Sequence, residues 1–254
     1  MSYVISFSGG LDSTTLLLHL LLKKRDIYAV TFDYGQKHKI EIQFAKKNIE
    51  YLKSNGITVN HRVIDVSDLV LLLDSSLTDK SIDIPEGHYM DNSMKSTFVP
   101  NRNAIFTSII YGYAISIYKK TKRDVLISLG VHSGDHLIYP DCRPIFYENI
   151  MKSFKLGNWD SEHIDIYTPY MQYTKSEIIK DGLKSSKKLN LNFDMIYKNT
   201  LTTYFPDSKG KSNGRTGSDV ERILAFNELG MKDPGLYTKS WESVLEYALN
   251  CDKS

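Results

Sequence analysis

Cysteine is scarce in this sequence, with only Cys142 and Cys251 among 254 residues. Two cysteines exclude the disulfide framework of a small secreted domain, and we expect a cytoplasmic protein. Long hydrophobic runs are also missing, because the longest, over residues 16–22, is interrupted by His19 and is far too short to span a bilayer. We therefore expect no membrane anchor and, since Met1 leads directly into a predicted strand, no signal peptide.

The sequence also has little excess charge. It contains 32 lysines and arginines against 30 aspartates and glutamates, a formal net charge of +2. This balance argues against a dedicated nucleic-acid binder, and the basic clusters at 119–123 and 184–188 are expected to be solvated helix ends. A hydrophobic content of 41% and a charged content of 24% are ordinary for a globular protein, and the length allows one α/β domain with a small appendage.

The most informative segment is the loop over residues 6–14, Ser-Phe-Ser-Gly-Gly-Leu-Asp-Ser-Thr, which lies between a short apolar run and a predicted helix over 14–22. Its two glycines allow a tight bend and a close approach to a ligand. The hydroxyls of Ser8 and Ser13, with the first N–H groups of the helix, predict a seat for phosphate oxygens. Asp12 would orient the loop or hold the magnesium ion that accompanies ATP. The loop lacks the Gly-Lys-Ser/Thr ending of a Walker A motif, which argues against simple transfer of the terminal phosphate.

Apolar strands alternate with helical patterns along the chain. We predict strands at 3–5, 27–32, 57–64 and 125–129, and helices at 14–22, 40–52 and 104–117. This order predicts an α/β fold with a doubly wound parallel sheet and ligands at the carboxyl ends of the strands. The turn-rich residues 72–101 would form a lid or a dimer contact. We expect a nucleotide-binding domain over 1–198 and a small helical appendage over 199–254, where the pattern loosens before two final helical runs.

The loop resembles the pyrophosphate-binding loop (PP-loop) of the ATP pyrophosphatase superfamily, which forms adenylates. The resemblance implies ATP binding by Ser8, Gly9, Gly10, Leu11, Asp12, Ser13 and Thr14. Further motifs follow in chain order: TFDYGQKH at 31–38, VPNRN at 99–103, GVHSGD at 130–135, YPDCRP at 139–144 and TKSEI at 174–178. Together, over residues 3–237, they resemble the 7-cyano-7-deazaguanine synthase family.

That resemblance implies an adenine nucleotide alpha hydrolase-like fold and an ATP-dependent ligase. Such an enzyme converts 7-carboxy-7-deazaguanine with ammonia first to an amide and then to a nitrile. It implies ATP and Mg²⁺ as cofactors, a small-molecule deazaguanine substrate and a homodimer, with neither nucleic acid nor membrane as a partner.

The catalytic residues that we expect are Asp12, Arg102 and Lys175. Both cations lie inside matched motifs and would face the ATP phosphates or the departing pyrophosphate, where fixed positive charge stabilises developing negative charge. Surface charge is the alternative explanation for each of them. His38 and His132 are candidate proton carriers.

The candidates for binding the substrate lie in two of the matched motifs. Either Asp135 or Asp141 would accept the paired N–H donors of a guanine-like edge, and Tyr139 would stack on the ring. Turn-capping carboxylates and a packed tyrosine are the alternative. Arg143 would bind the substrate carboxylate through two hydrogen bonds, or form a structural ion pair. Cys142 is expected to be a buried or lining thiol, since the adenylate route needs no cysteine nucleophile.

The chain departs from the family near its C-terminus. Members usually carry four cysteines there that bind a structural zinc ion, but the corresponding positions are Thr203, Asn213, Thr216 and Asp219, while Arg222 stays in register. This donor set predicts that no zinc is bound. The segment must then be held by hydrogen bonds or a partner, or else be mobile, and Asp219 is expected to lie at a helix start.

Two further functions remain open. Relatives of the synthase occur outside queuosine synthesis, including antiviral-defence systems, where the same adenylation could join the deazaguanine acid to an amine of a partner protein. The chain could also be a non-catalytic module that binds deazaguanine or ATP, although the intact loop and Lys175 argue against this. A tRNA-thiolating enzyme, which uses a similar loop, would need catalytic cysteines and a basic surface that this sequence does not supply.

Overall fold

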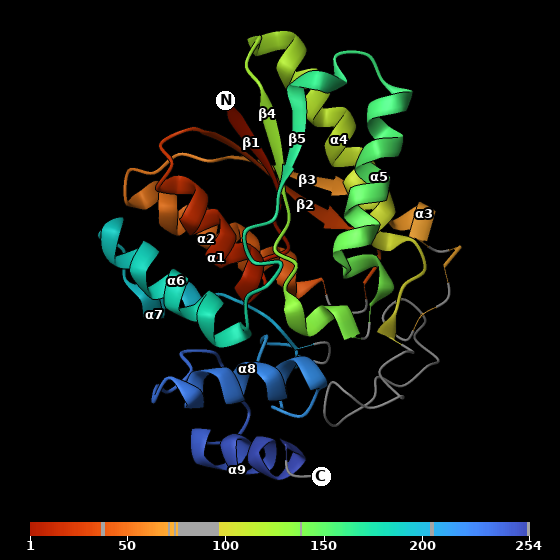
Figure 1. Ribbon diagram of the computed structural model, residues 1–254. Coiled ribbons are helices and arrows are strands. Elements are labelled where there is room, and N and C mark those ends of the chain that lie inside the picture. The colour runs from red at the N-terminus through yellow and green to blue at the C-terminus, as the bar shows by residue number, and fades with distance from the viewer. Residues whose placement is uncertain are drawn as a thin grey trace.

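The described part of the protein is built on five short strands connected by helices, as Figure 1 shows for the computed structural model. The structure describes residues 1–36, 39–70, 72–73, 75, 97–137, 139–203 and 206–252. The strands are β1 (Ser2–Ser6), β2 (Asp26–Asp33), β3 (Asn60–Asp65), β4 (Val125–Ser128) and β5 (Ile164–Tyr167). The α-helices are α1 (Leu11–Leu21), α2 (Ile40–Ser54), α3 (Ser67–Val70), α4 (Arg102–Thr121), α5 (Pro144–Gly157), α6 (Lys175–Lys188), α7 (Phe193–Tyr197), α8 (Gly217–Glu228) and α9 (Trp241–Asp252). Short 3₁₀ turns are η2 (Ser133–Leu137), η3 (Pro140–Cys142) and η4 (Ser161–His163).

The strands form one parallel sheet in the order β3-β2-β1-β4-β5. This order confirms the predicted doubly wound α/β fold. The chain runs outward from β1 to β3 on one side, then crosses to β4 on the other side of β1. The loops that follow β1 and β4 therefore diverge at the carboxyl edge between these strands, the place where ligands bind in such sheets.

Alternate residues of the central strand face two separate cores. Tyr3 and Ile5 pack in the core beneath α1 and α6, whereas Val4 faces the core beneath α4 and α5. In Figure 1 these two groups of helices lie on opposite sides of the sheet, with α8 and α9 beyond its lower end. Both faces are thus covered, as a parallel sheet requires.

The structure differs in places from the sequence-based expectation. Helix α1 begins at Leu11 rather than at residue 14, so that Asp12 and Ser13 belong to its first turn. Strand β3 begins at Asn60 rather than at 57. The edge strand β5 was not predicted, because its four residues are too few to show a clear alternation of apolar and polar side chains.

Two predictions concern residues that the structure leaves out. His38, and most of the predicted lid or dimer contact over 72–101, lie outside the described residues. Among the helices that are described, none combines the length and the apolar character needed to cross a membrane.

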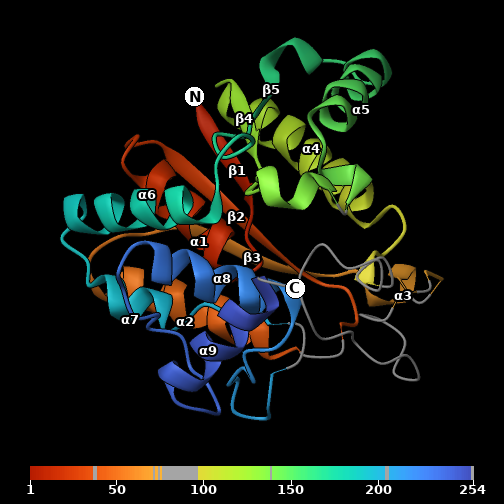
Figure 2. The ribbon, with the colours of Figure 1, turned by 60° about the horizontal axis from the view of Figure 1, so that its bottom comes forward.

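The C-terminal segment packs against the main body and is itself held together by a buried ion pair. Helix α8 packs against α6, and its Phe226 is fully buried in the core beneath α1. Figure 2 shows α8 alongside the helices of that layer, with α9 outside it. Arg222 on α8 is bound by both carboxylate oxygens of Asp233, at 2.6 and 2.8 Å, and Tyr237 donates a hydrogen bond to the same carboxylate. The segment after residue 198 therefore shares the main core. The division of the chain into two domains at this residue stays a prediction.

This ion pair generates a stability prediction. Replacing Asp233 by alanine leaves the Arg222 guanidinium, only 3% exposed, without its carboxylate. We expect the free energy of unfolding, measured by urea denaturation, to fall by about 3–5 kcal/mol. Asp26→Ala is the control, because it breaks an exposed pair with Arg123 and should cost at most about 1 kcal/mol. Equal losses in the two variants would contradict the structural role given to Asp233.

Candidate active site

The PP-loop is held in place by close backbone contacts. Gly9 has a φ of +86°, in the left-handed region, and a Cβ there would lie 2.9 Å from the backbone nitrogen of Ala45 and the carbonyl oxygen of Glu41. Only glycine adopts this φ readily and also leaves room for these backbone atoms. On the other side, a Cβ on Gly130, just after β4, would lie 3.3 Å from the backbone nitrogen of Ser13. The loop is therefore wedged between α2 and the β4 edge.

The start of α1 offers hydrogen-bond donors to a ligand. Its N-cap residue, Gly10, supplies no side-chain cap for the first N–H groups of the helix. The hydroxyls of Ser8 and Ser13 lie 3.1 Å apart beside them, and the Gly10 N–H donates to Ser8 Oγ at 3.2 Å. Uncapped donors together with a helix dipole and hydroxyls are suited to bind phosphate oxygens.

A cavity of about 280 Å³ opens at this edge of the sheet. Nine of the predicted site residues line it: Ser8, Gly10, Leu11, Asp12, Ser13, Arg102, Asp135, Tyr139 and Lys175. Four others do not lie on its wall: Gly9, Thr14, Asp141 and Arg143. The cavity thus brings together loops and helix ends that are far apart in the sequence.

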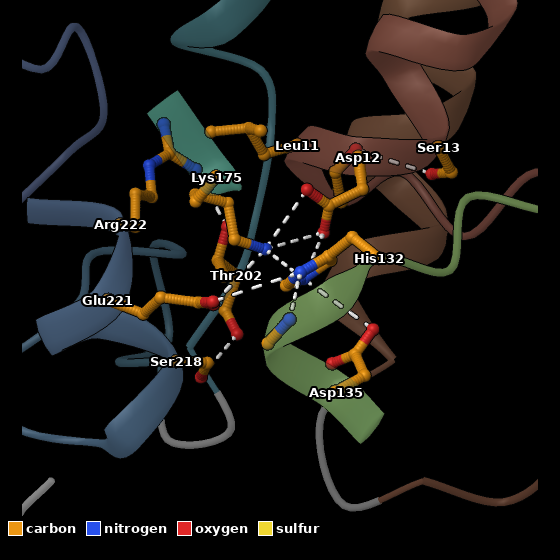
Figure 3. A network of polar contacts seen from close by, with 12 residues as sticks. Leu11, Asp12, Ser13, His132, Asp135, Lys175, Thr202, Ser218, Glu221 and Arg222 are labelled. Carbon is orange, nitrogen blue, oxygen red and sulfur yellow. Dashed lines mark hydrogen bonds and ion pairs between the residues drawn. The ribbon is translucent and has the colours of Figure 1, made fainter. Parts of the chain in front are cut away.

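Lys175 is the centre of a polar network in this cavity (Figure 3). The Lys175 ammonium donates to both oxygens of Asp12, at 3.0 and 2.8 Å, and lies 3.2 Å from Glu221 Oε2. His132 is buried behind it, with Nε2 2.8 Å from Lys175 Nζ and 3.5 Å from Asp135 Oδ2. Lys175 is the first residue of α6, and a capping box fixes the start of this helix. The predicted proton carrier His132 therefore contacts the predicted catalytic lysine.

The charges in this network stabilise each other. Burial lowers the pKa of Lys175, but Asp12, Glu221 and Asp135 outweigh this effect and raise the pKa above its usual value. Burial likewise raises the pKa of Asp12, and the nearby Lys175 and His132 reverse the shift and lower it. Lys175 is therefore cationic, and Asp12 anionic, throughout the neutral pH range.

Aromatic rings also line the cavity. Phe32 and Phe106 stack with ring centroids 4.1 Å apart, and the Arg102 guanidinium lies 5.6 Å from the centroid of the Tyr34 ring. Glu41 is another lining residue and accepts a hydrogen bond of 2.7 Å from the amide of Gln36. Flat apolar surfaces next to a few polar groups are typical of a nucleobase site.

Two carboxylates in the cavity, Glu41 and Glu221, were missed by the sequence reasoning. Glu41 follows the TFDYGQKH motif by three residues, and its partner Gln36 lies inside that motif. Extending the motif by three residues would have included Glu41 among the candidates. Glu221 directly precedes Arg222, which is in register with the family, but an acidic residue near the start of a helix has an ordinary explanation.

Three predicted residues have mainly structural surroundings. Asp141 accepts hydrogen bonds from Asn103 near the start of α4, and the exposed Arg143 donates through Nε to the His136 carbonyl at 3.0 Å. Cys142 is buried and lines the cavity, as expected. Burial raises the pKa of its thiol, which makes it a poor nucleophile.

The four positions that correspond to the family's zinc ligands do not fit a zinc ion. They offer two threonines, one asparagine and one carboxylate, whereas structural zinc takes cysteine and histidine. Both oxygens of Asp219 are already hydrogen-bonded, Oδ1 to Ser212 and Oδ2 to Thr216. Helix α8 starts here through a capping box of Thr216 and Asp219, which confirms the predicted helix start.

Comparison with known families agrees with this geometry. The family model described as "Queuosine biosynthesis protein QueC" matches residues 2–230. The chain belongs to the QueC family. The match covers the whole sheet and both α6 and α8, and therefore every element that lines the cavity.

Several QueC-family relatives carry the name 7-cyano-7-deazaguanine synthase. The protein of Psychromonas ingrahamii is 43% identical over 235 residues, which cover 92% of this chain and 96% of the relative. The protein of Caldicellulosiruptor saccharolyticus is 42% identical over 236 residues, covering 92% and 94%. That of Methanoregula boonei is 40% identical over 234 residues, covering 92% and 98%.

The half-buried Glu41 gives a pH-dependent prediction. Burial raises its pKa to about 7, although Gln36 and Arg102 act in the opposite direction. A carboxyl whose pKa is raised on folding stabilises the protein at low pH, and this stabilisation is lost as the pH rises from about 4.5 through 7. Glu41→Gln should therefore gain stability relative to the parent, by about 1–2 kcal/mol between pH 5 and pH 8, since solvent screens part of the shift.

Urea denaturation at both pH values measures this difference. Glu50→Gln is the matched control, because it changes an exposed glutamate on the same helix and should show no such pH-dependent gain. A stability difference between Glu41→Gln and the parent that stays constant with pH would contradict the prediction.

Proposed function

We propose that this chain is an ATP-dependent carbon–nitrogen ligase that adenylates 7-carboxy-7-deazaguanine, or a close analogue, and transfers the acyl group to ammonia. The observation that carries the proposal is the position of Lys175, held by Asp12 in the first turn of α1 and facing the phosphate seat of the PP-loop. Family membership and the names of the relatives support the same reaction.

The first chemical step would occur beside this lysine. An oxygen of the substrate carboxylate attacks the α-phosphorus of ATP, the bond from that phosphorus to the β-phosphate bridging oxygen breaks, and pyrophosphate leaves. Lys175 and Arg102 would stabilise the negative charge that develops on the pyrophosphate. The N–H groups at the start of α1, with Ser8 and Ser13, would bind the phosphate oxygens.

Magnesium would accompany ATP and neutralise part of the phosphate charge. Asp12 lines the cavity and supplies carboxylate oxygens, the donors that Mg²⁺ prefers.

The second step would join the acyl group to the amine. Ammonia attacks the acyl carbon, AMP leaves with its oxygen, and a proton is lost, which gives the amide. In a second cycle the amide oxygen would attack another ATP, and loss of AMP and two protons would give the nitrile. The Asp135 carboxylate would hold the guanine-like edge, with Tyr139 against the ring.

The direct test incubates the purified chain with ATP, Mg²⁺ and 7-carboxy-7-deazaguanine, with and without ammonium, and follows all products by mass spectrometry. We expect AMP and pyrophosphate together with the free amide or nitrile. A mass increase on a co-purified protein, without free product, would instead assign the acyl group to a protein amine. Intact ATP under every condition would leave a non-catalytic binding module and overturn the proposal.

A variant at Lys175 tests the mechanism. Lys175→Met should lower the rate of substrate-dependent ATP–pyrophosphate exchange by about 10²–10³-fold, because a fixed positive charge is lost where negative charge develops. Lys180→Met removes an exposed lysine from the same helix and should leave the rate unchanged. Circular dichroism and thermal unfolding verify that both variants are folded. Full exchange activity in a folded Lys175→Met would contradict the role of this residue.

A further inference from the structure

Three of the four positions that would bind a zinc ion in relatives lie together here, around one buried carboxylate. Asp219 is 1% exposed and accepts hydrogen bonds from Ser212 Oγ at 2.7 Å and from Thr216 Oγ1 at 2.6 Å. The Thr203 side chain also hydrogen-bonds this carboxylate. We call Asp219, Ser212, Thr216 and Thr203 the carboxylate cluster. Three of the four zinc-ligand positions, 203, 216 and 219, belong to it, and it ties the segment near residue 203 to the start of α8.

The carboxylate cluster determines where α8 begins. Thr216 is the N-cap residue of this helix, and its N–H donates to Asp219 Oδ2 at 3.2 Å while the Asp219 N–H donates back to Thr216 Oγ1 at 3.3 Å. Ser218 then donates to the carbonyl oxygen of Thr202 at 2.9 Å, and both residues line the cavity. The first turn of α8 is thereby fixed against the cavity wall.

Glu221 lies two residues beyond Asp219, in the same first part of the helix. One of its oxygens is 3.2 Å from Lys175 Nζ, and the other is 3.9 Å from His132 Nδ1 (Figure 3). A methyl group on Gly134 would overlap Glu221 Oε1, so the carboxylate fits closely between α6 and η2. The contacts of Glu221 with Lys175 and His132 therefore depend on where α8 begins.

We propose that Asp219 is a positioning residue which fixes the start of α8 without a metal ion and thereby holds Glu221 against Lys175. The active site is then complete in the zinc-free chain. The effect on turnover rests on the proposed function, whereas the metal content and the ordering of α8 do not.

The first test measures the zinc content of the purified chain and the effect of a chelator on its stability. We expect protein purified without added zinc to contain well under one zinc ion per chain by mass spectrometry of metals. Treatment with a zinc chelator in the presence of Mg²⁺ should leave the thermal unfolding temperature unchanged. One bound zinc ion per chain, or a loss of thermal stability on chelation, would overturn the metal-free anchor.

The positioning role is tested with Glu221→Gln, Asp219→Asn and the double variant. In Glu221→Gln we expect kcat for ATP–pyrophosphate exchange to fall about tenfold, since Lys175 loses one of its two carboxylate partners. KM for ATP should stay constant or fall, because one negative charge leaves the cavity that receives the triphosphate. Glu242→Gln is the control, an exposed glutamate in the same C-terminal segment that should change neither constant.

Asp219→Asn should lower kcat at least as much and also speed amide hydrogen exchange in the first turn of α8. If Asp219 acts through Glu221, the double variant should be no slower than Asp219→Asn alone. Independent, multiplying losses would overturn the positioning role, as would unchanged exchange in α8. If Asp219→Asn does not fold, Thr216→Val removes a single hydroxyl from the carboxylate cluster and is judged by the same two criteria. If the parent chain shows no turnover, hydrogen exchange and metal content still decide the inference, and only the proposed function fails.

Discussion

A buried positive charge requires nearby negative charge, and Lys175 receives it from two helices that are far apart in the sequence. Asp12 contributes one carboxylate from the first turn of α1, and Glu221 contributes another from α8. Because Lys175 is itself the first residue of α6, this single ammonium group joins the starts of three helices at the edge of the sheet. The arrangement of the cavity depends on that junction.

The wall of the cavity combines two chemically different surfaces. Charged groups surround the helix starts, where phosphate oxygens would bind, and the rings of Phe32 and Phe106 supply flat apolar surface. Adenylation needs both: strong fixed charges for the phosphate chemistry and flat surfaces for a base. The parallel sheet brings them together, because β1 leads into the PP-loop and its neighbour β2 carries Phe32 near the same carboxyl edge.

The parts of the structure that follow local rules could be predicted from the sequence. The alternation of the first four strands with helices, the PP-loop and the helix start near Asp219 each depend on short segments with clear periodicity or capping residues. Glu41 and Glu221 could not be found this way, since their roles depend on contacts with Gln36 and Lys175 made only in the folded chain. The contact of Asp141 with Asn103, a residue of the cavity wall, is likewise made only in the folded chain.

The pairing of Arg222 with Asp233 has a consequence for the folding of the protein during its synthesis on the ribosome. The PP-loop and Lys175 are synthesised before α8, and the buried ion pair of α8 can form only after Asp233 and Tyr237 have been added to the chain. Residues that do not line the cavity therefore stabilise the helix that supplies Glu221. A chain cut between α8 and Asp233 would keep every residue of the cavity wall but would leave the Arg222 guanidinium buried without its carboxylate.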